Sequence, residues 1–503
     1  MAPSVVSRAA ALGALTAAGQ LIIIGSLPAY SRLFDPGTYG EYVIFVGVVG
    51  VVSVLAGVRY DSAIVLPRNA TVASALSALV VLIAAAVAAV IAAATLVAVA
   101  SAPAGWLGAR PQFGYGLAAA TVIGALQRTL SSWCVRRGRF LLMGFGQFAF
   151  CLVSVGAQLS LTLALDQSAA LVWGYVGALG VQTACLATPA LHTDGPVWAS
   201  GASWRGMRIA AGKYRRFPTY MVGYALASSA RDRLIQIVLG IGAGAAVVGR
   251  FALAYRVAFA PNSLLYSAIS PVFFAIATRG SKAAVGRFAA AAVEATFLLL
   301  VVPYVAFALE APALTDELLS AKWRGTGPYL QALAGPALLL AATCWLDRAF
   351  DSFRRQNVAF ALEASFTLVS VGLVGALSGR IDAVSIAWAF GTLGIIYYWT
   401  YLLITFVACG FPLAELRRAC ATGALAIAAA LGSGVLIHQL PGLILRVTAY
   451  ALLMVTVIVL WLRFRDGTAI LQLLTRSRVG DTAELEAARV PQIDSPGESG
   501  KRG

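Results

Sequence analysis

Seven arginines stand within strongly apolar segments of this chain or at the edges of those segments. They are Arg59, Arg128, Arg231, Arg233, Arg250, Arg256 and Arg446. A charged side chain at the centre of a lipid bilayer costs about 3 kcal/mol, so such residues mark a functional site by default. A guanidinium donates two parallel hydrogen bonds to phosphate oxygens and stays charged when water is removed. We therefore expect a site for an anionic, phosphate-bearing group, with all of these arginines except Arg446 as candidates for contacting it.

The run Arg231-Asp232-Arg233 is the densest of these charges. Successive helical residues turn by about 100°, so its two arginines lie about 200° apart and only one can face a given cavity. We expect Asp232 to pair with a nearby arginine while Arg231 or Arg233 meets the anion. The alternative is an internal ion-pair network that pins this helix. For Arg59 the alternative is that its side chain snorkels to the membrane interface.

Four carboxylates are candidates for charge pairing or for ion coupling: Asp61, Asp232, Glu294 and Glu363. Paired or solvated carboxylates are the commoner situation, and proton or sodium coupling stays open. An anionic cargo needs no such ion, because each negative charge that moves out of a negative cytoplasm gains about 2.3 kcal/mol per 100 mV.

The segments that carry these charges form a regular series of about fourteen apolar stretches. A helix needs about 20 residues to cross a hydrocarbon core about 30 Å thick. We place the spans at 10–30, 41–65, 73–101, 113–133, 145–165, 169–190, 218–240, 248–277, 288–309, 328–346, 358–378, 383–408, 419–437 and 442–462. The chain is 60% hydrophobic and 12% charged, with a mean hydropathy of +0.83, which predicts an all-α polytopic membrane protein. Twelve or thirteen helices remain alternatives, because the seventh segment is charged and Arg446 interrupts the last.

Lysine and arginine are concentrated in every second turn, which predicts how the chain is oriented in the membrane. With the N-terminus in the cytoplasm, 25 of the 37 basic residues fall on the cytoplasmic side and five on the opposite side. Because positive charge favours the cytoplasmic side, we expect both termini there, in a bacterial inner membrane. The formal charge of +16 then needs no nucleic-acid partner, since topology and anionic headgroups account for it.

Metal and cofactor chemistry find little support in the residue types. The six cysteines are scattered without a CxxC spacing, and neither His192 nor His438 belongs to a ligand-spaced cluster. We expect buried free thiols, no metal and no cofactor. A monomer is the default expectation for the oligomeric state.

The chain also contains a weak internal repeat. Gly40 and Gly249 each open an apolar helix and are each followed by a charged residue and then an aromatic one. Two lobes of equal helix number that face a central cavity are a common transporter architecture. We therefore expect six-helix lobes at 1–191 and 218–408, joined by a basic cytoplasmic linker at 192–217. Residues 409–462 then form two additional helices, and residues 463–503 form a polar, disordered tail.

Three stretches of this sequence resemble the Wzx-type oligosaccharide flippases of polysaccharide biosynthesis. They are Pro28-Ala29-Tyr30-Ser31-Arg32-Leu33-Phe34-Asp35-Pro36 with Tyr39-Gly40; Arg59-Tyr60-Asp61 through Leu66-Pro67; and Arg216-Phe217-Pro218 through Gly249-Arg250-Phe251 to Pro261. The resemblance implies the fold of the multidrug/oligosaccharidyl-lipid/polysaccharide (MOP) exporters. It also implies a cargo, an undecaprenyl-pyrophosphate-linked oligosaccharide, with a polymerase and glycosyltransferases as partners. Arg32 belongs to the first motif, where loop structure is its expected role and substrate contact the alternative.

Three other functions compete with this interpretation. A drug or cation antiporter of the same fold needs acidic residues inside the bundle, whereas the deep charges here are mostly arginines. A lipid II flippase fits fourteen helices, but the opening motifs look more like the exopolysaccharide members. An integral-membrane enzyme needs a sizeable loop with paired carboxylates; the longest outer loop, about 310–327, holds Glu310, Asp316 and Glu317, which we expect to be solvated at the surface.

Overall fold

The computed structural model describes residues 5–67, 69–201, 203–215, 218 and 222–464, and this part of the chain is helical throughout, without strands. The helices are α1 (Val5–Gly25), α2 (Leu27–Leu33), α3 (Pro36–Gly57), α4 (Tyr60–Ala63), α5 (Ala70–Ser101), α6 (Trp106–Ala109), α7 (Pro111–Arg136), α8 (Phe140–Leu161), α9 (Gln167–Gly201), α10 (Trp204–Lys213), α11 (Val222–Ala243), α12 (Ala245–Arg279), α13 (Lys282–Leu318), α14 (Gly327–Thr343), α15 (Asp347–Ser352), α16 (Gln356–Leu377), α17 (Ala383–Cys409), α18 (Leu413–His438) and α19 (Leu443–Phe464), with short 3₁₀ turns η2 (Ala321–Trp323) and η3 (Cys344–Leu346). The predicted all-α membrane fold is confirmed. The predicted tail lies almost entirely outside the described residues.

Eleven segments of the described chain are long and apolar enough to cross a membrane. Three further long helices, α7, α11 and α12, fall outside that set. These three carry Arg128, Arg233, Arg250 and Arg256, the residues that the sequence marks as a site. The prediction of fourteen spans therefore stays a prediction.

Three predicted boundaries differ from the structure. The second span, predicted at 41–65, breaks where α3 ends at Gly57, because Val58 and Arg59 have left-handed backbones with φ of 44° and 58°. The predicted outer loop at 310–327 is mostly helix, since α13 continues through Pro303 and Pro312 to Leu318. Much of the predicted linker is helical too, in the end of α9 and in α10.

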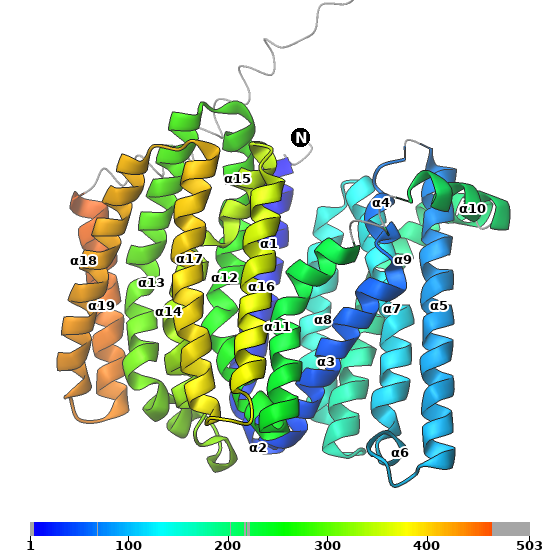
Figure 1. Ribbon diagram of the computed structural model, residues 1–503, viewed down its shortest axis with the longest axis horizontal. Coiled ribbons are helices and arrows are strands. Elements are labelled where there is room, and N and C mark those ends of the chain that lie inside the picture. The colour runs from blue at the N-terminus through cyan, green and yellow to red at the C-terminus, as the bar shows by residue number, and fades with distance from the viewer. Residues whose placement is uncertain (1–4, 68, 202, 216–217, 219–221, 465–503) are drawn as a thin grey trace, which may run out of the picture.

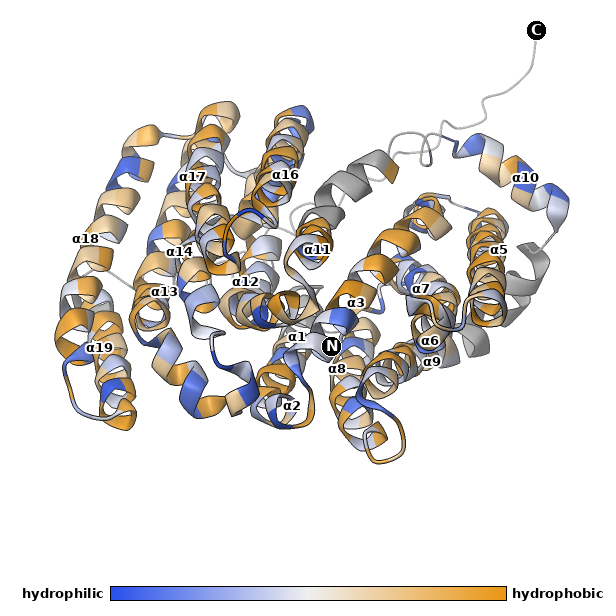
Figure 2. Ribbon diagram, turned by 60° about the horizontal axis from the view of Figure 1, so that its bottom comes forward, coloured by the Kyte–Doolittle hydropathy of each residue, from blue (hydrophilic) through white to orange (hydrophobic). Residues whose placement is uncertain are grey.

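The long helices pack as two bundles that lie side by side (Figures 1 and 2). The first bundle contains α3, α5, α7, α8 and α9, and the second contains α11, α12, α13, α14, α16 and α17. Helix α1 lies at the seam, where it packs on α8 of the first bundle and on α12 of the second. Orange, apolar residues cover much of both bundles in Figure 2, as a lipid-facing surface requires.

The two bundles meet at the end of the molecule where α2 lies, which we call the α2 end (Figure 1). There α3 and α12 cross through Gly40 and Gly249: a Cβ on Gly40 would lie 1.7 Å from the Ala245 carbonyl oxygen, and one on Gly249 would lie 2.0 Å from that of Pro36. Only glycine allows two helix backbones to approach this closely. The repeat glycines of the sequence therefore face each other at the crossing.

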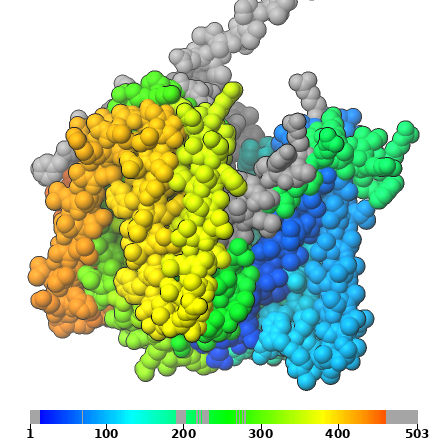
Figure 3. Space-filling view, viewed as in Figure 1, coloured from blue at the N-terminus to red at the C-terminus, as the bar shows by residue number. Residues whose placement is uncertain are grey.

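Polar contacts add to this crossing at the same end. The Ser320 amide donates to Ser31 Oγ at 3.1 Å, and the buried Trp323 indole donates to the Phe34 carbonyl oxygen at 3.1 Å. Lys322 and Asp35 form an ion pair at 2.9 Å. The α2 end is thus closed by backbone approach, an indole anchor and a charge pair together. In the view of Figure 3 the two bundles are in contact along this lower edge.

The two C-terminal helices are held on α13 by a buried charge cluster. Glu310 is 1% exposed; its Oε2 accepts from Arg446 Nη1 at 2.6 Å and its Oε1 lies 2.8 Å from His438 Nδ1. The expectation that Glu310 is solvated at the surface is therefore wrong, because α13 extends further than predicted and carries this residue under α18 and α19. Arg446 does not interrupt its helix either, since α19 is continuous from Leu443 to Phe464.

The glycine crossing yields a first prediction. Gly40→Ala should force α3 and α12 apart, lower the apparent melting temperature by an amount equivalent to about 1–3 kcal/mol, and lengthen the distance between spin labels at Asp35 and Lys322. Gly37→Ala, three residues earlier on α3 with no atom within 4 Å of the new methyl group, is the matched control. Equal effects of the two variants would show that the crossing does not hold this end closed.

The buried cluster yields a second prediction. Glu310→Ala leaves Arg446 without its carboxylate and should destabilise the protein by about 3–5 kcal/mol, measured as loss of the folded fraction on heating in detergent. Adding Arg446→Ala should restore part of that stability, because the unpaired charge is then gone. Glu317→Ala removes an exposed carboxylate from the same helix and should have no effect. A stable Glu310→Ala protein would contradict this account of α18 and α19.

Candidate functional site: an arginine row along α3

Arg128 of α7 lies against the end of α3. Its Nη2 donates to the Ser53 carbonyl oxygen at 2.8 Å, and its Nε lies 3.6 Å from Asp61 Oδ2. Gly57 and Gly124 lie beside the guanidinium, where a Cβ on either would be at ordinary contact distance, 3.8 and 3.5 Å from its nitrogens. The Arg128 side chain keeps 28% of its surface exposed, so the charge is partly accessible as well as anchored.

Arg233 of α11 lies against the middle of α3. Its Nη1 donates to the Val46 carbonyl oxygen at 3.0 Å. The side chain runs directly over Gly50, where a Cβ would lie 2.5 Å from Arg233 Nε. Gly47, one turn earlier, leaves ordinary contact distance, with 3.8 Å to Arg233 Cβ. Gly50 therefore provides the space that this cation occupies.

Arg256 of α12 lies nearer the α2 end, among tyrosines. Its Nη1 donates to the Tyr39 hydroxyl at 3.2 Å. The Tyr39 ring packs 5.9 Å from Tyr42 and 5.6 Å from the buried Trp323. The hydrogen-bond partner of Arg256 is thus a neutral phenol and not a carboxylate.

The three anchoring points on α3 are evenly spaced. Arg256, Arg233 and Arg128 contact Tyr39, Val46 and Ser53, which are seven residues apart. A step of seven residues returns to nearly the same helix face and rises about 10 Å. Three helices from both bundles therefore place their arginines in one line about 20 Å long on α3. We call these three residues the arginine row.

Aromatic side chains connect the members of the row. Tyr42 packs 6.2 Å from Tyr175 of α9, and both Arg233 and Arg128 lie within electrostatic range of Tyr175. Tyr30 donates to Gln158, whose Nε2 donates to the Leu171 carbonyl oxygen at 3.0 Å. Phenol and amide groups of this kind can hydrogen-bond sugar hydroxyls as well as position a cation.

The row ends at the strained break after α3. Arg59 has a left-handed backbone, its Nε is buried without a hydrogen-bond partner, and its charge lies within range of Arg128. Asp61 is 5% exposed, and its Oδ1 is also buried without a partner. Backbone strain and unsatisfied polar atoms are typical of functional sites. Four arginines and this one carboxylate leave the region with a net charge of three positive.

The other predicted residues lie elsewhere. Arg250 has a buried Nε without a partner and faces Tyr329 of α14 within the second bundle. Arg32 ends α2 and is exposed at the α2 end. Glu294 of α13 is 4% exposed, and Glu363 of α16 lies within electrostatic range of Tyr401, both inside the second bundle. The side chains of Arg231 and Asp232 lie outside the described residues.

Sequence reasoning missed the neutral partners of the row. Tyr39 stands within the first quoted motif and Tyr42 follows three residues later, so this pair of aromatic residues at the start of an apolar helix was a usable signal. Tyr175 and Gln158 had no such signal, because they come from α9 and α8 and meet α3 only through the tertiary packing. Among the described residues, no group of three or more His, Cys, Asp or Glu side chains could hold a metal ion.

This arrangement can bind an extended anion. The row offers guanidinium donors at three depths, and in the described part of the chain only one of them is paired with a carboxylate. An anionic group could therefore pass from one guanidinium to the next and remain within reach of a cation throughout.

Comparison with known proteins identifies the family of the chain. A model of the polysaccharide biosynthesis protein family matches residues 30–328, which is more than half of the chain and includes every member of the row. No curated protein sequence gives a match.

Solved structures show the same fold at low sequence identity. The lipid II flippase MurJ in an inward closed conformation is 10% identical and superposes with a TM-score of 0.69, covering 90% of this chain and 98% of MurJ. An inward-facing multidrug resistance MATE family transporter of the MOP superfamily is 14% identical, with a TM-score of 0.59 and coverage of 83% and 99%. Together with the family match, these superpositions establish that the chain has the MOP exporter fold and belongs to the polysaccharide biosynthesis protein family.

Proposed function

We propose that this protein is a flippase that carries undecaprenyl-pyrophosphate-linked oligosaccharide from the cytoplasmic to the outer leaflet for surface polysaccharide synthesis. The observation that carries the proposal is the arginine row, in which three helices of two bundles present cations along one face of α3. A diphosphate headgroup is the lipid-borne anion that such a row suits best. Polymerase and glycosyltransferases that make and consume this lipid are the partners that the function requires.

The proposed orientation places the α4, α10 and α15 end in the cytoplasm. Helix α10 supports this, because it exposes Arg205 and Arg208 beside Trp204 and Ile209, which are 71% and 62% exposed. A helix of this composition lies in the headgroup region, where basic residues meet the anionic lipids of the cytoplasmic leaflet. The closed α2 end then faces outward, and the cargo enters from the cytoplasmic side.

The mechanism follows from the two bundles and from α3, which arginines of both bundles contact. Arg128 belongs to the first bundle, whereas Arg233 and Arg256 belong to the second, so a diphosphate on the row bridges both. When the bundles rock about the seam, the contacts between the arginine row and α3 change and the α2 end opens. The outward movement of negative charge is favoured by a negative cytoplasm, and the net positive site returns with the same field. No coupling ion is needed in this cycle.

An apolar groove beside the row suits the lipid tail. It has a volume of about 580 Å³ and is lined by Ile44 and Val48 of α3, by α5 and α7, and by Ile237 and Ile241 of α11. The groove and the row use different faces of α3. The tail can therefore remain among apolar side chains while the headgroup follows the arginines.

Two functions of the same fold are the competitors. A lipid II flippase would use the same row, and only the cargo separates it from the proposal. A multidrug antiporter needs free carboxylates in the first bundle, whereas Asp61 is paired with Arg128. In a deletion strain, loss of surface glycan with accumulation of completed lipid-linked units would support the proposal. Unchanged glycan with altered drug tolerance would overturn it.

Removing the charge of any one arginine of the row should slow transport. Arg128→Gln, Arg233→Gln and Arg256→Gln should each slow flipping of a fluorescent undecaprenyl-diphosphate oligosaccharide in proteoliposomes by about 10- to 100-fold, as expected for losing a charged hydrogen bond of about 1.5–3 kcal/mol. Arg324→Gln removes an exposed arginine outside the row and is the control. Unimpaired flipping by all three row variants would remove the row from the mechanism.

A methyl group added at Gly50 should slow flipping without changing any charge. Gly50→Ala should displace the Arg233 side chain and slow flipping as much as Arg233→Gln does, with little loss of thermal stability, because a flexible side chain can move aside. The double variant should be no slower than either single one, since both remove the same contact. Gly47→Ala is the matched control, and similar slowing by it would contradict this account.

A further inference from the structure

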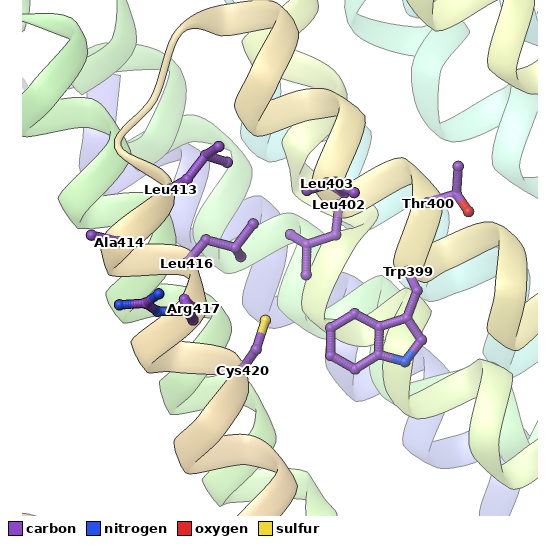
Figure 4. A pocket seen from close by; sticks show the side chains of 9 residues that line it. All are labelled: Trp399, Thr400, Leu402, Leu403, Leu413, Ala414, Leu416, Arg417 and Cys420. Carbon is purple, nitrogen blue, oxygen red and sulfur yellow. The ribbon is translucent and has the colours of Figure 1, made fainter.

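A second apolar groove lies on the outer face of the second bundle, between α17 and α18 (Figure 4). It has a volume of about 590 Å³ and is lined by Trp399, Thr400, Leu402 and Leu403 of α17 and by Leu413, Ala414, Leu416, Arg417 and Cys420 of α18. The two helices share a short turn but pack mainly on other helices, α17 on α14 and α18 on α13. Helix α13 packs against both helices through Phe297, whose ring stacks on Trp399 with centroids 6.2 Å apart and lies against Gly423.

The groove is short and lies near one end of its two helices. Its lining on α18 runs from Leu413, the first residue of that helix, to Cys420. Seven helical steps rise about 10 Å, which is less than half of a hydrocarbon core about 30 Å thick, so the groove fits within one leaflet. Leu403 and Leu413 are 52% and 47% exposed along its length, so the apolar wall is open to the surrounding lipid. Part of a single acyl chain from the surrounding leaflet fits a groove of this length and access.

Basic residues gather at the turn where the groove begins. Arg417 stands at the outer rim of α18, while Leu413, Leu416 and Cys420 face α17 (Figure 4). Lys282 Nζ lies 3.7 Å from the Cβ position of Gly410, and Arg355 lies within electrostatic range of Cys409. Arg417 is exposed and has no ion-pair partner among the described residues, unlike its neighbour Arg418, which pairs with Glu415 at 3.6 Å.

These features commit the groove to one occupant. We propose that the α17–α18 groove binds an anionic phospholipid of the adjacent leaflet, with one acyl chain between the helices and the phosphate held by Arg417 and Lys282. A zwitterionic lipid would fill the groove equally well but would gain less from the cations. The lipid would bridge α17 of the second bundle to α18, and through α18 to the pair of C-terminal helices. The proposal is independent of the flippase function, because the groove lies apart from the arginine row.

Native mass spectrometry of the full-length protein tests this site. The protein is purified in a mild detergent, equilibrated with equal amounts of phosphatidylglycerol and phosphatidylcholine, and released from the micelle with its bound lipids. We expect preferential retention of phosphatidylglycerol. Arg417→Gln should lower that preference by about 5-fold, as expected for one basic residue near an anionic surface. Arg418→Gln, one residue along and already paired, should leave it unchanged.

A second pair of variants tests the apolar part of the site. Cys420→Phe fills the groove and should reduce retention of both lipids, whereas Leu425→Phe enlarges a side chain that is 72% exposed outside the groove and should change neither. Equal effects of Arg417→Gln and Arg418→Gln would mean general surface attraction and would overturn the proposal. Preferential retention of an added undecaprenyl phosphate would also overturn it, by assigning the groove to a polyprenyl tail.

Discussion

The cost of placing a guanidinium in a low-dielectric interior is the constraint on which this structure depends. An unpaired buried charge is so unfavourable that an acceptor greatly stabilises a deep arginine. Arg128 and Arg233 donate to carbonyl oxygens of α3, and Arg256 donates to a tyrosine hydroxyl on the same helix; of these three, Arg128 also lies near a carboxylate, that of Asp61. Main-chain carbonyls and phenols stabilise a cation without neutralising it. The charges are therefore tolerated in the fold and remain available to an anion.

Glycine residues on α3 make the close contacts with this helix sterically possible. Gly40 lets α12 approach the backbone of α3 at the α2 end, and Gly50 leaves the space that the Arg233 side chain fills. One helix thus serves two purposes along its length: it closes the molecule at one end and carries cations toward the other. The absence of a Cβ allows the close approach of α3 and α12 at the seam, and it also allows the Arg233 side chain to lie over α3 at the candidate site. A change in the angle between the bundles must therefore alter the site.

The C-terminal helices illustrate a different response to the same constraint. Arg446 is neutralised by the buried carboxylate of Glu310, which His438 also contacts, and this cluster contains no spare cation for a ligand. The contrast distinguishes a charge that a buried carboxylate neutralises from charges that mainly neutral acceptors stabilise. Where a carboxylate meets the arginine fully, the charge fixes helices together; where carbonyls and phenols meet it, the charge stays available.

Much of the fold was predictable from the sequence, because spanning a bilayer imposes a length and a composition on each helix that any hydropathy pattern displays. The series of long apolar helices, the deep arginines and the paired glycines were all visible in this way. The break at Val58 and Arg59 and the helical continuation of α13 to Leu318 were not, because left-handed residues and tolerated prolines depend on neighbours distant in sequence. Most of all, the sequence contains Arg128, Arg233 and Arg256 on three separate helices, and nothing in it relates them. Only the tertiary structure brings them to one face of α3, since the seven-residue spacing belongs to their acceptors, Tyr39, Val46 and Ser53, and these become acceptors only when α7, α11 and α12 pack on α3.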